Sequence, residues 1–106
     1  MDAFEFSALV HEQARSGRAY LEFLRVPSMS MGLYVLPAGG VDPQQPHAED
    51  EAYYIVEGRG MINLAGEEQM VQAGSLVYVA TGVKHHFYAI TETLKILVFF
   101  APAETN

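Results

Sequence analysis

A chain of 106 residues is long enough for one domain, and we expect a single domain over residues 1–106. The 13 acidic side chains outnumber the 6 basic ones, and the basic ones form no cluster. We therefore expect no nucleic-acid partner and no binding to an acidic membrane surface. The absence of cysteine excludes disulfides, thiolate nucleophiles and cysteine-ligated zinc, and it fits a cytoplasmic location. We expect neither a secretory signal nor a membrane span, because no apolar run is long enough.

Residues 1–18 differ from the rest and predict an N-terminal helical extension. Ser7 is placed to cap a short helix over Ala8–Ser16, and Gly17 is placed to end it. The amphipathic pattern of this segment is weak. We expect the helix to pack across the edge of the main domain.

From about residue 20 to residue 101 the chain alternates short β-prone runs with Gly/Pro punctuation. Turns are predicted at Gly58-Arg59-Gly60, at Ala65-Gly66-Glu67 and at Glu92-Thr93. We expect the last four residues to fray. Short strands at this spacing, without helices between them, predict an all-β antiparallel sandwich or barrel. The expected strands are Ala19–Val26, Met29–Leu36, Ala52–Val56, Gly60–Leu64, Gln69–Val71, Ser75–Val79, His85–Ile90 and Leu94–Ala101.

Two groups that can bind a divalent metal, His47 and Glu51, stand where a loop rich in glycine and proline becomes a strand. Because side chains alternate along a strand, Glu51, Tyr53 and Ile55 share one face. On the later strand His85, Phe87 and Ala89 share a face, and His86 points the other way. A metal at Glu51 would therefore have Tyr53, Ile55 and Phe87 beneath it.

The residues around Glu51 form one half of a recurring two-part pattern. Its first motif is a glycine, five residues, His-x-His, three or four residues, a glutamate, six residues and a glycine. Gly39, His47, Glu51 and Gly58 match these positions, and Gln45 stands at the first histidine position. The pattern resembles the first motif of the cupin superfamily.

The second cupin motif is a glycine, five residues, Pro-x-Gly, two residues, a histidine, three residues and an asparagine. Gly74, Gly82 and His85 match it, whereas Ala80 and Ala89 replace the proline and the asparagine. The resemblance implies a double-stranded β-helix, also called a jelly-roll barrel, between about residue 20 and residue 101.

The resemblance also implies a divalent metal inside the barrel, held by His47, Glu51 and His85. Gln45 could supply a fourth ligand. This donor set suits Fe, Mn, Ni, Co or Zn. Residues expected to contact a small-molecule ligand are Tyr53, Ile55, Phe87 and Met61.

Two functions remain open at this point. The first is a metal-dependent enzyme, similar to a dioxygenase or an isomerase, that acts on a small organic molecule. The second is a non-catalytic small-molecule-binding module whose metal is structural or absent. We also expect a homodimer, because both faces of the strand from Leu94 to Phe100 are largely apolar.

Overall fold

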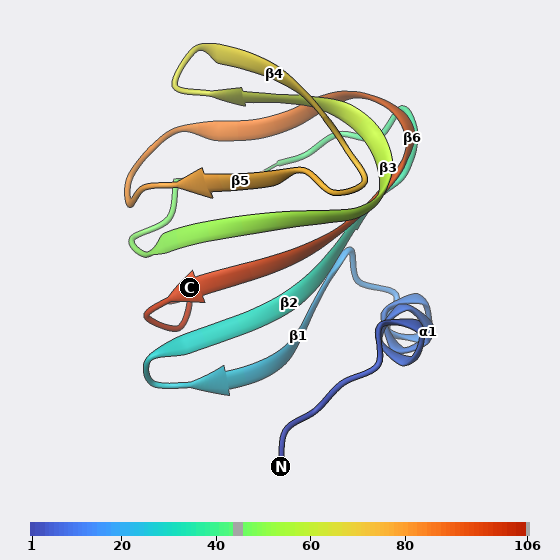
Figure 1. Ribbon diagram of the computed structural model, residues 1–106, viewed down its shortest axis with the longest axis vertical. Helices are drawn as coiled ribbons and strands as arrows, with labels where there is room; N and C mark the ends of the chain where they lie inside the picture. Colours follow the sequence, from blue (N-terminus) through green and yellow to red (C-terminus); the bar gives the residue numbers. More distant parts are fainter. Residues whose placement is uncertain (44–45, 106) are drawn as a thin grey trace.

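A computed structural model describes residues 1–43 and 46–105 (Figure 1). The helix α1 comes first, and the strands that follow pair only antiparallel within the described residues. The elements are α1 (Phe6–Ser16), β1 (Tyr20–Val26), β2 (Met29–Leu36), β3 (Asp50–Leu64), β4 (Glu67–Gln72), β5 (Leu76–Val79) and β6 (His85–Ala101).

All the strands in the described part of the chain belong to one six-stranded sheet, and its two long strands, β3 and β6, bend in the middle. The sheet thereby folds into two layers, called here the larger sheet and the smaller sheet. Residues 51–54 of β3 pair with β5 on one side, and residues 50–55 pair with residues 96–101 of β6 on the other. β2 and β1 continue this larger sheet. Residues 59–64 of β3 pair with β4 and with residues 85–92 of β6 to form the smaller sheet. The sheets curl over one another into the predicted antiparallel barrel (Figure 1).

The turns predicted at Gly58-Arg59-Gly60 and at Glu92-Thr93 are wrong, because β3 and β6 continue through these positions without a break. The pairing register of β3 and β6 slips several times between Ile55 and Met61. Gly58 has a φ of 101°, and a Cβ at this position would overlap the carbonyl oxygen of Thr93. The glycine therefore marks a β-bulge at which the strands bend without separating.

The helix begins earlier than expected. It covers Phe6–Ser16 and follows Glu5, whose backbone carbonyl accepts the first two bonds, so Ser7 is not the cap. Gly17 ends the helix in the left-handed conformation, as predicted. Leu9 is its buried residue. Within residues 1–43 and 46–105 no helix is long and apolar enough to cross a membrane.

The core lies between the two sheets, and the predicted alternation of β3 is confirmed. Tyr53 and Ile55 are fully buried, whereas Tyr54 is exposed. In β6 the alternation breaks at Ala89, which has a φ of 47° and is exposed although we expected it to face inward with His85. Ile90 takes the inward position instead. A bulge in the strand thus changes which face the following residues occupy.

Candidate metal centre

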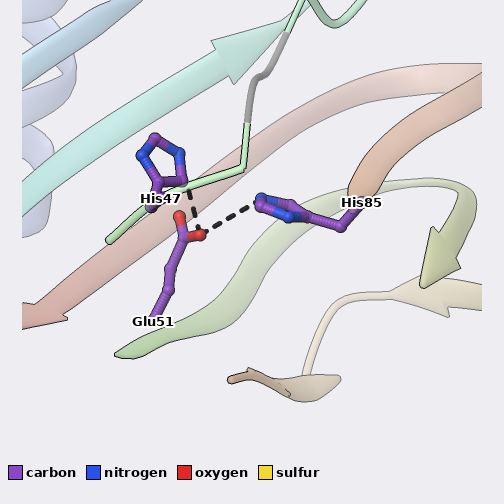
Figure 2. Close-up of side chains that lie close together, drawn as sticks. All are labelled: His47, Glu51 and His85. Atoms are coloured by element: carbon purple, nitrogen blue, oxygen red, sulfur yellow. Dashed lines mark ion pairs between the residues drawn. The ribbon is translucent and has the colours of Figure 1, made fainter. Parts of the chain in front are cut away.

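Three side chains that can bind a metal meet at one end of the barrel. His47 lies in the loop before β3, Glu51 lies at the start of β3, and His85 opens β6. Their ligand atoms all lie within 4.8 Å of one another. Figure 2 shows the carboxylate of Glu51 between the two imidazoles. Gln45, the possible fourth ligand, lies outside the described residues.

Three hydrogen bonds connect the turn before β6 to the loop before β3 and to the first residue of β3. The backbone N–H of Gly82 donates to the carbonyl of His47 at 2.8 Å. Thr81 donates its hydroxyl to the carbonyl of Ala48 at 2.6 Å and its backbone N–H to the carboxylate of Asp50 at 3.0 Å. These bonds hold together the segments that carry His47 and precede His85, two candidate ligands that lie far apart in the sequence.

Glu51 and His85 are buried, and His47 is half-buried beside them. Glu51 is 2% exposed, and its Oε1 lies 3.2 Å from Nε2 of His85 and 3.9 Å from Nε2 of His47. Oε1 is sealed from solvent, and within the described residues no aligned hydrogen bond reaches it. A buried carboxylate of this kind needs a compensating charge, either a proton on an imidazole or a metal ion.

The pKa of His85 responds to two opposing effects. Burial favours the neutral ring, but contact with Glu51 and with the carbonyl of Val83 outweighs it and raises the pKa above its ordinary value. Nδ1 of His85 lies 2.8 Å from that carbonyl oxygen. Nε2 is thereby directed at Glu51, which is the arrangement of a histidine prepared to bind a metal.

The residues present fit a divalent metal. Two imidazoles and one carboxylate lie close together, and among residues 1–43 and 46–105 no aligned hydrogen bond reaches Oε1 of that carboxylate. This donor set suits divalent transition metals and leaves coordination positions open. His86, the neighbour of His85, is exposed and packs beside Tyr88 instead, with ring centroids 5.4 Å apart.

Glu104 is a site residue that the sequence reasoning missed. Its Oε2 lies 3.3 Å from Nδ1 of His47. The pKa of Glu104 is raised, chiefly by burial, while His47 opposes the rise. Neither motif extends to Glu104, which belongs to the C-terminal segment that we expected to fray. That expectation fails for residues 103–105, which are tied to the barrel by hydrogen bonds.

A pocket of about 370 Å³ opens beside the cluster. Tyr53, one of the four residues expected to contact a ligand, lines it. Ile55 and Phe87 lie in the core instead, and Met61 pairs with Met70 and Tyr88 across the outer face of the smaller sheet. The lining comprises three carboxylates, four aromatic rings and three other side chains: Glu22, Glu51, Glu104, Tyr20, Tyr34, Tyr53, Phe100, Arg18, His47 and Val98.

Behind the pocket a buried carboxylate joins its wall to the core. Asp42 accepts a hydrogen bond from the hydroxyl of Tyr34 at 2.6 Å and another from the backbone N–H of Phe87 at 2.9 Å. Burial, followed by the contact with Asp42, raises the pKa of Tyr34. The phenol therefore stays protonated and acts as a fixed donor to Asp42.

Comparison with known proteins agrees with this architecture. Residues 32–100 match the model of the cupin domain family, so the chain belongs to this family. An uncharacterized protein of Streptomyces coelicolor is 49% identical over 99% of this chain and 100% of its own length.

Solved structures similar to this chain share its fold at low sequence identity. A protein of Bacillus halodurans superposes with a TM-score of 0.79 at 17% identity, covering 99% of this chain and 85% of its own. An RmlC-like cupin of Shewanella frigidimarina superposes with a TM-score of 0.73 at 19% identity, covering 79% and 75% of the two chains. These likenesses confirm the cupin barrel predicted from the two motifs.

Proposed function

We propose that His47, Glu51 and His85 hold one divalent transition metal, and that the protein is a metal-dependent enzyme acting on a small organic molecule. The observation that carries the proposal is the buried Glu51 carboxylate, which faces an imidazole nitrogen on either side at the edge of a pocket. Candidate metals are Fe, Mn, Ni, Co and Zn. The reaction class that we favour resembles that of a dioxygenase or an isomerase.

The metal would supply Lewis acidity or the ability to activate O₂. The side chains around the pocket enclose the small molecule. Tyr53 and Phe100 form an apolar wall, and Arg18 and Glu22 provide charged groups that can orient a polar ligand. A volume of about 370 Å³ suits a small molecule and excludes a polymer chain from full entry.

A non-catalytic binding module is the second candidate, and one structural observation favours it. The Tyr34 hydroxyl, a polar group in the pocket wall, is already engaged by Asp42 and is not available to transfer a proton. The glutamine at position 45, in place of a histidine, points the same way. In this case the pocket would hold a small molecule without turnover.

Metal analysis of the purified protein tests the first proposal. We expect about one equivalent of a divalent transition metal in the wild type, and a large loss in His47→Ala and in His85→Ala. His86→Ala is the matched control, because it removes an adjacent imidazole that faces outward. Wild-type protein that holds no metal, and takes none up from Fe(II), Mn, Co, Ni or Zn, would overturn the proposal.

Turnover separates the two candidate functions. The metal-loaded protein is offered a panel of small phenols and diketones while oxygen consumption and product formation are followed. Turnover that disappears in His85→Ala supports the enzyme. Saturable binding of a compound without turnover supports the binding module.

A further inference from the structure

The C-terminal segment, residues 102–105, returns across the end of the barrel where the metal cluster lies. We propose that Glu104 in this segment is a positioning residue of the metal site, which holds Nδ1 of His47 so that Nε2 faces Glu51. This inference rests on the proposed metal site and extends it to a residue outside both cupin motifs. The evidence is the placement of the two carboxylates on opposite nitrogens of one ring.

The geometry at His47 assigns a different task to each nitrogen. Nδ1 lies 3.3 Å from Oε2 of Glu104, and Nε2 lies 3.9 Å from Oε1 of Glu51. A neutral imidazole carries a hydrogen on one nitrogen and a lone pair on the other. Both carboxylates can only accept, and Glu104 lies closer to its nitrogen than Glu51 does, so Glu104 favours the ring form with hydrogen on Nδ1. The lone pair of Nε2 then points toward the cluster.

His85 shows the same arrangement with a different partner. Its Nδ1 lies 2.8 Å from the carbonyl oxygen of Val83, and its Nε2 faces Glu51. Metal-binding histidines usually donate their second N–H to a carboxylate or a backbone carbonyl. Glu104 therefore does for His47 what the Val83 carbonyl does for His85. Both rings present Nε2 to the same carboxylate oxygen.

The segment is held firmly enough to serve this purpose. The backbone N–H of Glu104 donates to the buried hydroxyl of Ser30 at 2.9 Å, and the carbonyl of Glu104 accepts from Arg25 at 2.7 Å. One residue further, the hydroxyl of Thr105 donates to the carboxylate of Glu49 at 2.7 Å. These contacts fix the backbone on both sides of the Glu104 side chain.

The ring of His47 also lies beside two other rings, those of His85 and Phe100. Phe100 packs edge-on against the ring, with centroids 4.9 Å apart. Such a contact restrains the plane of the imidazole but does not distinguish Nδ1 from Nε2. The carboxylate of Glu104 makes that distinction.

The experiment compares wild type, Glu104→Gln and Glu104→Ala by two readouts. The first is the ¹⁵N NMR spectrum of His47 in metal-free protein, which reports which nitrogen carries the hydrogen. The second is affinity for Zn²⁺ or Ni²⁺, measured by competition with a chelator. We expect Glu104→Ala to shift His47 away from the Nδ1–H form and to weaken metal binding by about 10- to 100-fold.

Glu104→Gln is the informative conservative variant. Its amide oxygen can still accept from Nδ1–H, so we expect the wild-type ring form and a loss of less than about 10-fold. Thr105→Val is the control for the segment, since it removes only the hydroxyl bond to Glu49, while the backbone N–H of Thr105 still donates to that carboxylate at 3.2 Å and the Glu104 carboxylate stays in place. It should stay close to wild type in both readouts.

Three results would overturn the inference. One is an unchanged His47 spectrum and an unchanged affinity in Glu104→Ala. Another is a loss in Glu104→Gln as large as that in Glu104→Ala, because the glutamine keeps the oxygen that would accept from Nδ1–H. The third is a wild-type His47 that carries its hydrogen on Nε2. A wild type that binds no metal would defeat the proposed function, while the NMR readout would still decide the role of Glu104.

Discussion

His85 and Glu51 join the two sheets of the barrel through one contact of 3.2 Å between Nε2 and Oε1. Glu51 belongs to the larger sheet, where its backbone is paired with Phe100 and Val79. His85 belongs to the smaller sheet, paired with Leu64. The candidate metal site therefore sits where the sheets meet. A group bound there would link both layers of the fold.

Metal affinity should fall as the pH is lowered. The pKa of His85 is raised, so the folded protein keeps the imidazolium to a higher pH than an unfolded chain does. A metal must displace that proton, and binding is therefore weakened below the raised pKa and approaches a plateau above it. Titration with Ni²⁺ at about pH 6, 7 and 8 measures the trend. An affinity that does not change across this range would contradict it.

Asp42→Asn should destabilise the protein by about 1–3 kcal/mol. The buried carboxylate accepts from Tyr34 and from the backbone N–H of Phe87, and the amide would set its own N–H₂ against one of these donors. Urea denaturation measures the loss. The control is Glu57→Gln, which changes a carboxylate in the exposed pair with Lys95 and should cost no more than about 0.5 kcal/mol. Equal losses in the two variants would refute the argument.

Gly58→Ala should be more damaging than Gly74→Ala. Both glycines have a positive φ, 101° and 93°, which costs an alanine about 1–2 kcal/mol. Only at Gly58 does the new Cβ also overlap backbone, at Thr93, whereas open space surrounds Gly74. We expect Gly58→Ala to lose about 1–3 kcal/mol more than Gly74→Ala. Thermal or urea unfolding of the pair checks this, and similar losses would argue against a tight bend.

The homodimer remains a prediction, and the structure suggests where its interface lies. Leu76 and Tyr78 are 77% and 63% exposed, and they neighbour Tyr54 on the outer face of the larger sheet. The same face continues to Leu97 on β6. An exposed apolar band of this kind is typical of an association surface.

Sedimentation velocity at micromolar concentration tests the dimer. We expect wild type to sediment as a dimer and Leu76→Glu or Leu97→Glu to sediment as a monomer, because each places a charge in the apolar band. Met70→Glu is the control, since Met70 is an exposed apolar residue of the smaller sheet. A monomeric wild type would reject the prediction.

The amino-acid sequence by itself predicted an antiparallel sandwich or barrel. Its resemblance to the two cupin motifs implied the barrel and the grouping of His47, Glu51 and His85. Alternating apolar residues select the inward face of each strand, and the glycines of the two motifs place the candidate ligands at strand ends. Because neighbours on a strand face opposite ways, only one of His85 and His86 could join the site, and the second cupin motif implied His85.

The tertiary structure alone decided how the strands bend, what lines the pocket and which residue supports His47. A turn was predicted at Gly58 because glycine is common both in turns and in β-bulges. Only the pairing of β3 with β6 shows that this glycine lies in a bulge. Ile55 and Phe87 lie in the core and do not line the pocket, whereas Tyr53 does both. Glu104 pairs with His47, which lies 57 positions earlier in the sequence, and no local sequence pattern predicts a contact over such a separation.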